Sequence, residues 1–215
     1  KVSIILVIII SISLSIVFYT KEEVKTDYYD QQIEATLKTK EAFDAVKEKR
    51  LDLNVLINEH LDPLKTGLIG DKQTITSNSI TTTLGNLDAK RTSTNPNFAA
   101  LIVKYLKDLD LKENDSVAVN FSSSFPALNI ATIVALDVLN LNSVIQTSIG
   151  ASTYGANIVE FTYLDMEKHL FEVGIIKRET DLISLGGERD VLSGMNQNDE
   201  EFNNSLCKRI EATNK

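Results

Sequence analysis

A strand–helix–strand pattern decides the fold, and it runs through residues 116–149, SVAVNFSSSFPALNIATIVALDVLNLNSVIQTSI. The first part, 116–121, is a β-rich run that predicts a short strand. A serine-rich loop ending in a proline then opens an apolar helix, predicted over 127–139. A turn at 140–142 leads to a second strand over 143–149. Two strands joined by a helix through short connections predict a βαβ unit with parallel strands.

The same alternation continues on both sides of this unit. Upstream, apolar residues at helical spacing predict a helix over 96–109, with Asn95 as its cap and Pro96 as its first helical residue. Downstream, a further helix ends at Gly174 and a third strand covers 182–185. The sequence therefore predicts an α/β domain over 96–215, built on a Rossmann-like βαβ parallel sheet.

Each predicted strand ends in a loop of small polar residues. Right-handed crossovers bring the carboxyl ends of parallel strands to one edge of the sheet, where such folds bind ligands. Backbone N–H groups in loops of this kind hold carboxylate or phosphate oxygens. The residues predicted to bind an anion at this edge are Ser122, Ser123, Ser124, Gly150, Ser152, Gly186 and Gly187.

A hydroxyl-rich stretch precedes the domain, and it carries a basic pair. Ten of the 21 residues from 74 to 94 are Ser or Thr. This composition is too polar for a core element, so residues 63–95 are predicted as a polar loop. Hydroxyls and a basic pair shortly before a helix N-terminus suit an anion, although a long solvated loop is the alternative interpretation. The predicted anion contacts of this stretch are Thr81, Thr82, Thr83, Lys90 and Arg91.

The first 20 residues predict a transmembrane anchor. Val2 to Tyr19 is interrupted only by four serines, and as a helix it would be about 27 Å long, close to the roughly 30 Å hydrocarbon core of a bilayer. A signal peptide, with Ser13-Leu14-Ser15 at its cleavage site, is the alternative. The anchor predicts a single-pass plasma-membrane protein whose domain is extracytoplasmic.

Residues 21–62 predict a long amphipathic stalk helix. The stretch from Thr26 to about Leu61 lacks glycine and proline, and its apolar residues recur at roughly helical spacing. This helix is expected either to hold the domain away from the membrane or to lie against the domain. Pro63 and Gly67 are predicted to end it, with His60 near its carboxyl end as a partner of the helix dipole.

Composition excludes several classes of function. The 22 basic and 30 acidic residues give a net charge of −8, which argues against general nucleic-acid binding. One cysteine, Cys207, and two histidines, His60 and His169, leave no material for a disulfide framework or a zinc cluster, and no metal site is predicted. Neither a G-x-G-x-x-G fingerprint nor a Walker A loop is present, so no cofactor is predicted.

Candidate catalytic residues are few. Ser122, Ser123 and Ser124 stand at a strand-to-helix turn, but they lack the flanking glycines of a nucleophile elbow. His169 falls inside a helix, which disfavours a catalytic triad. Asp165 fits a capping box with Thr162 better than a catalytic acid. Glu188-Arg189-Asp190 is interpreted equally well as a site segment or as an exposed turn.

Five stretches in the order 80–101, 124–128, 149–156, 161–166 and 184–190 resemble the bacterial poly-γ-glutamate system proteins. They read ITTTLGNLDAKRTSTNPNFAAL, SFPAL, IGASTYGA, FTYLDM and SLGGERD. The resemblance implies membrane-associated work in making, exporting or anchoring poly-γ-glutamate, a polyanionic polymer of the bacterial cell surface. It also implies that the chain is truncated at its carboxyl end, and it carries over no catalytic residues.

Three hypotheses follow from the sequence. The first is a membrane-anchored accessory protein of poly-γ-glutamate (capsule) biosynthesis or export that binds the polymer or its synthase. The second is a hydrolase or transferase that acts on the polymer through Ser122, Ser123 or Ser124. The third is a structural subunit of a membrane complex that works through the 26–61 helix.

Overall fold

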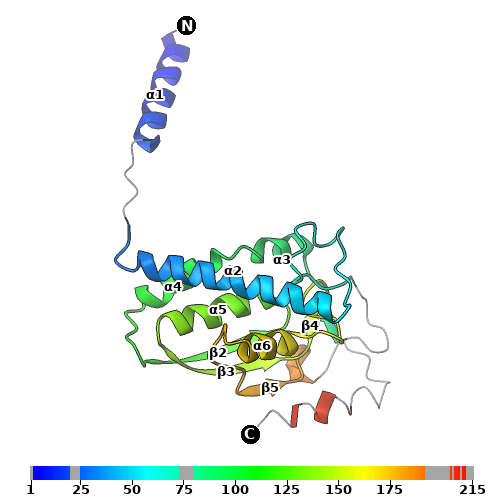
Figure 1. The fold of residues 1–215 in the computed structure, drawn as a ribbon. Coiled ribbons are helices and arrows are strands. Elements are labelled where there is room, and N and C mark those ends of the chain that lie inside the picture. The colour runs from blue at the N-terminus through cyan, green and yellow to red at the C-terminus, as the bar shows by residue number, and fades with distance from the viewer. Residues whose placement is uncertain are drawn as a thin grey trace.

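The computed structural model describes residues 2–19, 25–72, 80–191, 204, 206–208, 210 and 211. It confirms an α/β fold with parallel strands (Figure 1). The elements, in chain order, are α1 (Val2–Tyr19), α2 (Tyr29–Asp52), β1 (Thr81–Thr83), α3 (Leu87–Ser93), α4 (Phe98–Asp108), β2 (Ser116–Ser122), α5 (Pro126–Val138), β3 (Asn142–Ser148), β4 (Ala151–Ser152), α6 (Tyr163–Glu172), β5 (Leu182–Ser184) and the short 3-10 helix η1 (Glu188–Asp190).

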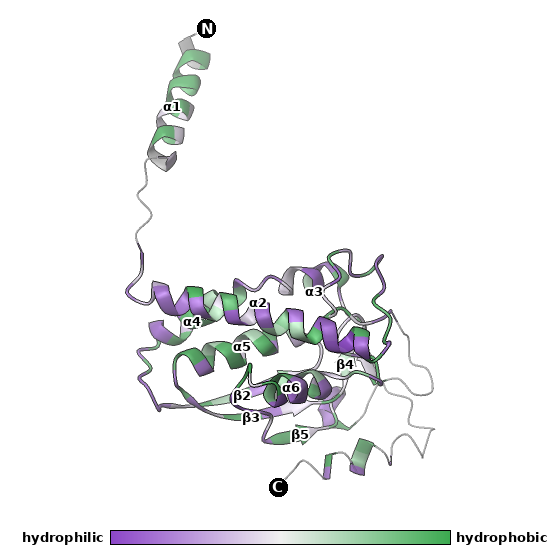
Figure 2. Ribbon diagram, in the orientation of Figure 1, coloured by the Kyte–Doolittle hydropathy of each residue, from purple (hydrophilic) through white to green (hydrophobic). Residues whose placement is uncertain are grey.

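The main sheet has the strand order β2-β3-β5, and all its pairs are parallel. Side chains alternate across it, because successive residues of a strand point to opposite faces. On β3, Ile145 and Thr147 are buried and Val144 and Gln146 are exposed. The buried face packs against a core drawn from α2, α4, α5 and α6, of which α5 is the most apolar (Figure 2).

A second, two-stranded parallel sheet joins β1 to β4. It lies within the stretch predicted as a polar loop over 63–95, which also contains α3, so that prediction was wrong for residues 81–93. The physical reason is that Ile80 anchors the stretch in a second small core, while Asn86 caps α3 by accepting a hydrogen bond from Ala89 N at 2.9 Å. Residues 73–79 of the predicted loop lie outside the described residues.

The long helix α2 is not a stalk. It packs along α4 and α5 and buries Ala42, Phe43 and Val46 in the main core. It also ends at Asp52 rather than near Leu61, with Asn54 in the left-handed region at φ 55°. Consequently His60 does not lie at the carboxyl end of a helix.

The N-terminal helix α1 lies apart from the domain in Figure 1 and is almost uniformly apolar in Figure 2. The large apolar side chains of its described residues, from Ile4 to Ile16, are 49–66% exposed. Within the described residues, no helix combines the length and the apolar character needed to cross a membrane.

The sequence predicts caps at the starts of two helices, α4 and α6. The capping box of α6 is confirmed, because the Asp165 carboxylate accepts a hydrogen bond from Thr162 N at 2.8 Å. The start of α4 differs: the helix begins at Phe98, and Asn95 Oδ1 instead accepts from Asn97 N at 3.0 Å. Asn95 and Pro96 therefore form a turn before the helix rather than its cap and first residue.

Candidate functional site

A cavity of about 490 Å³ lies beyond the carboxyl ends of β1, β2, β3 and β5, and we call it the strand-end cavity. Such an edge is where parallel α/β sheets hold their ligands. Five hydroxyl side chains and three glycines line it together with two carboxylates. The lining residues are Thr82, Thr83, Ser122, Ser124, Ser148, Gly150, Gly186, Gly187, Glu188 and Asp190.

The structure brings most of the predicted anion-site residues to this cavity. Thr82 and Thr83, Ser122 and Ser124, and the glycines at 150, 186 and 187 all line it. Thr81, Ser123 and Ser152 are buried, and none of them lines the cavity. The basic pair Lys90-Arg91 does not line it either.

The Ser122–Ser124 loop is held rigidly by its own hydroxyls. Ser122 Oγ donates to Ser124 Oγ at 2.9 Å, and Ser124 Oγ accepts from Ser152 N at 2.9 Å. Ser123 Oγ turns inward and donates to Ser148 O at 2.7 Å. Gly155 backs this loop so closely that an added Cβ would stand 2.8 Å from Ser124 Cα. The loop is therefore fixed from behind and presents Ser122 and Ser124 to the cavity.

Lys90 is buried beneath the strand-end cavity and is only 2% exposed. Its Nζ donates to Ser124 O and, at 2.8 Å, to Ser152 Oγ, and it lies 3.5 Å from the centroid of the Phe125 ring. Burial lowers the pKa of the Lys90 ammonium to about 8. With oxygens on two sides and an aromatic ring on a third, the ammonium fastens the loops that shape the cavity rather than facing a ligand.

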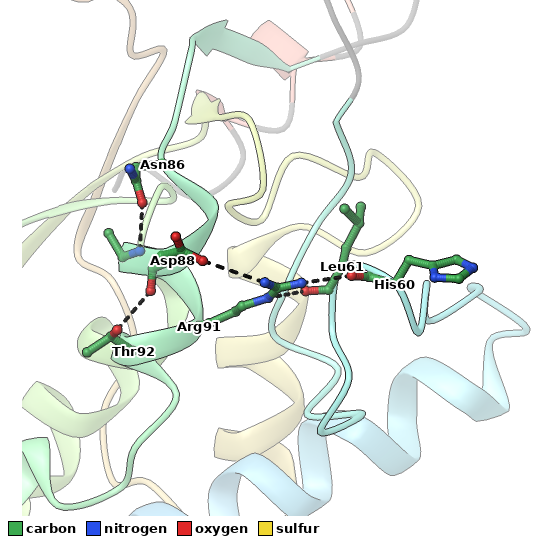
Figure 3. Close-up of polar contacts among 7 residues, drawn as sticks. His60, Leu61, Asn86, Asp88, Arg91 and Thr92 are labelled. Atoms are coloured by element: carbon green, nitrogen blue, oxygen red, sulfur yellow. Dashed lines mark hydrogen bonds and ion pairs between the residues drawn. The ribbon is translucent and has the colours of Figure 1, made fainter.

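Arg91 lies next to Lys90 in sequence but has different partners, and Figure 3 shows it reaching toward His60 and Leu61. Its Nε donates to Leu61 O at 2.9 Å and its Nη2 to His60 O at 2.7 Å. Its Nη1 lies 3.6 Å from Asp88 Oδ1, one helical turn back on α3. The predicted basic pair is thus divided, because consecutive residues on a helix face about 100° apart, and Arg91 ties α3 to the 60–61 segment.

Two acidic residues line the cavity that were not among the predicted site residues. Gly186 and Gly187 both adopt positive φ, 83° and 82°, and turn the chain back. This turn lets Asp190 accept a hydrogen bond from Gly186 N and places Glu188 on the lining. The sequence signal for them is the Glu188-Arg189-Asp190 segment after the glycine pair, a pattern that fits a site segment and an exposed turn equally well.

No histidine is among the lining residues, and the titratable groups on the lining are the carboxylates of Glu188 and Asp190. His169 lies on α6 opposite α2, where burial and the nearby Lys49 lower its pKa, and it does not line the cavity. Among the described residues, no group of three or more His, Cys, Asp or Glu side chains is placed to hold a metal ion. What the cavity offers is hydroxyl donors and acceptors, backbone N–H groups and two carboxylates.

Comparisons with known proteins return no match for this chain among family models, curated proteins or solved structures. The function is therefore argued from the chemistry of the strand-end cavity and from the resemblance in the sequence.

Proposed function

We propose that this protein is a membrane-associated accessory protein of poly-γ-glutamate synthesis or export, and that its strand-end cavity binds a short segment of the polymer. The observation that carries the proposal is the cavity itself, a pre-formed hydroxyl- and glycine-lined space of about 490 Å³ at the strand ends. The resemblance to poly-γ-glutamate system proteins supplies the identity of the ligand.

The chemistry of a γ-glutamyl segment suits this lining. Each unit presents an amide N–H, a carbonyl and an α-carboxylate, so it needs donors and acceptors at close spacing. Threonine and serine hydroxyls supply both, and glycines let a ligand approach the backbone closely. The ammonium of Lys90, beneath the loop of Ser124, contributes a fixed positive potential without occupying the cavity.

The two acidic residues, Glu188 and Asp190, make one side of the cavity more negative than the other. Glu188 and Asp190 repel carboxylates on their side of the cavity, so the carboxylates of a bound segment belong on the side of Thr83, Ser122 and Ser124. The free amino end of a chain, which is cationic, belongs near Glu188. This arrangement favours local, modest binding of a chain end over wrapping of a long polyanion, as expected for a protein that carries net charge −8.

The proposed association of this protein with the membrane depends on α1. A helix that is apolar on all sides is stable only where those side chains leave water, and those of α1 are exposed in the isolated chain. We propose that α1 associates the domain with the plasma membrane, with the domain on the outer side.

A direct test uses the full chain in detergent micelles with short γ-glutamate oligomers, following thermal stabilisation and oligomer length together. We expect stabilisation without shortening, and we expect Ser122→Asp to remove it because it adds a carboxylate to the cavity. Ser116→Asp is the matched control, since Ser116 is an exposed serine at the other end of the same strand. Stabilisation that survives Ser122→Asp, or its absence in the unmodified chain, would refute the binding proposal.

Shortening of the oligomers would instead favour the hydrolase or transferase hypothesis. The geometry does not favour it, because the hydroxyls of Ser122, Ser123 and Ser124 donate to or accept from one another, a backbone carbonyl or a backbone amide. A nucleophilic serine needs a base within hydrogen-bond reach. If shortening occurs and is lost in Ser122→Ala or Ser124→Ala, the altered serine is required for cleavage and the hydrolase or transferase hypothesis is favoured. A chain that neither binds nor cuts the oligomers would leave the structural-subunit hypothesis.

A further inference from the structure

The main sheet ends at β2, and one side of that strand is open among the described residues, because β3 alone pairs with it. At its end, Ser123 N donates to Ser148 O on the β3 side at 3.3 Å. Successive residues of a strand direct their backbone groups to opposite sides, so the N–H and C=O groups of Ala118 and Asn120 point away from β3. Within the described part of the chain, no residue forms a hydrogen bond with these four groups. β2 therefore presents unpaired backbone donors and acceptors along an open edge.

This edge lacks the features that usually keep a strand from pairing. β2 is seven residues long and contains no proline, and no charged residue occurs from Ser116 to Leu136. The side chains of Ala118 and Asn120 are exposed. Soluble proteins usually protect a sheet edge with a lysine, a proline or a very short strand, and a long uncharged edge pairs with another strand. The edge of β2 is therefore suited to a partner strand.

A second copy of β2 fits this edge in an antiparallel register centred on Val119. Ala118 of each chain then lies opposite Asn120 of the other. Both are hydrogen-bonded pairs of an antiparallel ladder, so the four unpaired groups of each chain all find partners. Charge favours a second copy as the partner, because two chains of net charge −8 repel each other and the uncharged β2 edge lets them meet without opposing like charges. The two three-stranded sheets join into one.

One pair of strands buries less surface than the roughly 1,200–2,000 Å² of a stable interface, and α4 offers a further apolar surface. Leu101, Tyr105 and Leu109 follow one another at four-residue spacing and are 38%, 57% and 71% exposed. We call them the α4 stripe. α4 packs against α5, which joins β2 to β3. In Figure 1, α4, α5 and α6 follow one another in the same order as β2, β3 and β5, so α4 lies on the β2 side of the helix layer. A two-fold axis perpendicular to the sheet at Val119 brings the two α4 helices toward each other.

We propose that this chain forms a homodimer in which the β2 edges pair in antiparallel orientation and the two α4 stripes pack against each other. The dimer has a defined register, with Val119 of both chains on the two-fold axis. The proposal does not depend on the ligand of the strand-end cavity.

The oligomeric state is measured on the full chain in detergent micelles by light scattering, with the mass of the detergent subtracted. We expect twice the 23.9 kDa of one chain. The mass of a single chain at protein concentrations up to about 100 μM would overturn the proposal, because the β2 edge would then belong to another segment or to another protein.

Disulfide cross-linking tests the register, with the native cysteine removed by Cys207→Ser. Val119→Cys should form a covalent dimer on mild oxidation, because residues that face each other on the axis have Cα atoms about 4.5 Å apart, which a disulfide can span. Val117→Cys is the matched control. Val117 is also partly buried and on the same face of β2, but its two copies lie about 13 Å apart along the paired strands. Equal cross-linking of the two variants, or none with Val119→Cys, contradicts the proposed pairing.

Two further variants disturb the contacts of the dimer. Ala118→Pro removes an outward N–H and leaves the ladder to β3 intact, so we expect a monomer. Tyr105→Asp places a charge in the α4 stripe and should weaken dimerisation at least about tenfold. Phe171→Asp is its control and should leave dimerisation unchanged, because Phe171 is an exposed aromatic residue on α6.

Far-UV circular dichroism establishes that each variant is folded. If Ala118→Pro does not fold, the comparison of Tyr105→Asp with Phe171→Asp decides the outcome. A dimer that survives Tyr105→Asp and every folded β2 variant forms through another surface, such as α1, and the proposal is then wrong.

Discussion

Lys90 and Arg50 are both buried cations, each 2% exposed, and among the described residues neither pairs with a carboxylate at ion-pair distance. They hold different parts of the chain. Lys90 joins separate segments beneath the strand-end cavity, namely α3, the loop after β2, and β4. Arg50 instead holds its own downstream chain, from Leu56 to Ile69, against the end of α2.

The difference follows from the two side chains. An ammonium is a compact point charge with three donors, and around Lys90 two oxygens and an aromatic face occupy its sides. A guanidinium is a planar fork with five donors, and the carbonyls around Arg50 engage its two terminal nitrogens while Nε remains unused. Lys90 therefore joins separate segments, whereas Arg50 holds one loop through three hydrogen bonds and keeps a buried Nε–H without an acceptor among the described residues.

The largest effect on stability is expected from Arg50→Met. The variant leaves the carbonyls of Leu56, Gly67 and Ile69 without their donor, so we expect a loss of about 4 kcal/mol in the free energy of unfolding. Urea denaturation followed by far-UV circular dichroism measures it. Lys40→Met, an exposed cation on the same helix, should change stability by less than about 0.5 kcal/mol. A loss below about 1 kcal/mol for Arg50→Met would mean that the fork does not hold this loop.

Glu167 is a third buried titratable group, an acid whose hydrogen-bond partners are neutral. It is 2% exposed and accepts hydrogen bonds from Tyr163 OH, Thr180 Oγ1 and Thr180 N. Burial raises the pKa of its carboxyl to about 7, and the hydrogen bonds from Thr180 offset this only in part. The folded chain thus holds a proton that the unfolded chain, with an ordinary pKa near 4.5, releases.

The sign of the pH effect follows from that difference. Because the folded state binds more protons between pH 4.5 and 7, stability is highest below pH 4.5 and falls as pH rises through 7, by about 3 kcal/mol for this group. We expect Glu167→Gln to remove this part of the pH dependence in denaturation series from pH 4.5 to 8. Glu172→Gln, an exposed carboxylate on the same helix, should leave it unchanged. Parallel pH profiles for Glu167→Gln and the parent would contradict the prediction.

Lys90→Met should change the free energy of unfolding less at pH 7, by about 1 kcal/mol or less. The lost hydrogen bonds to Ser124 O and Ser152 Oγ are offset by removing a charge that is costly to bury. In the parent, the folded-state pKa of about 8 lies below the ordinary 10.5, so the folded chain binds fewer protons in that window and stability rises with pH from 8 to 10.5. Denaturation at pH 7 and pH 10 should show that rise in the parent and not in Lys90→Met. An equal rise in both would exclude Lys90 as its source.

Much of the fold was predictable because its strands and helices follow strong local patterns. The β2–α5–β3 unit was predicted within one residue at most boundaries, since hydrophobic period and the proline at 126 agree there. The end of α2 was not predictable, because the 53–61 segment contains no glycine or proline and keeps apolar residues near helical spacing. The tertiary bonds from Arg50 to Leu56, Gly67 and Ile69 outweigh that local preference.

The candidate site was predictable only as far as topology determines it. Parallel strands bring Ser122, Gly150 and Gly186 together whatever their side chains do. β1 and α3 were missed because a three-residue strand and a seven-residue helix carry little periodic signal. The directions of Lys90 and Arg91 depend on that missed helix, so adjacency in sequence was mistaken for a shared function.

The clearest test of that division comes from Arg91→Ala beside Lys90→Met. Arg91 is partly exposed and bonds only the carbonyls of His60 and Leu61 and the exposed Asp88, so its loss should cost about 1 kcal/mol of stability. It should leave binding of γ-glutamate oligomers unchanged, because its guanidinium does not line the strand-end cavity. Lys90→Met, by contrast, loosens the Ser124 loop and removes the positive potential beneath it, so it should weaken that binding even where stability is preserved. Titrating γ-glutamate oligomers into each variant at the same pH and ionic strength compares their affinities. If Arg91→Ala weakens oligomer binding as much as Lys90→Met, the two cations act together, and the division drawn from their directions on α3 is wrong.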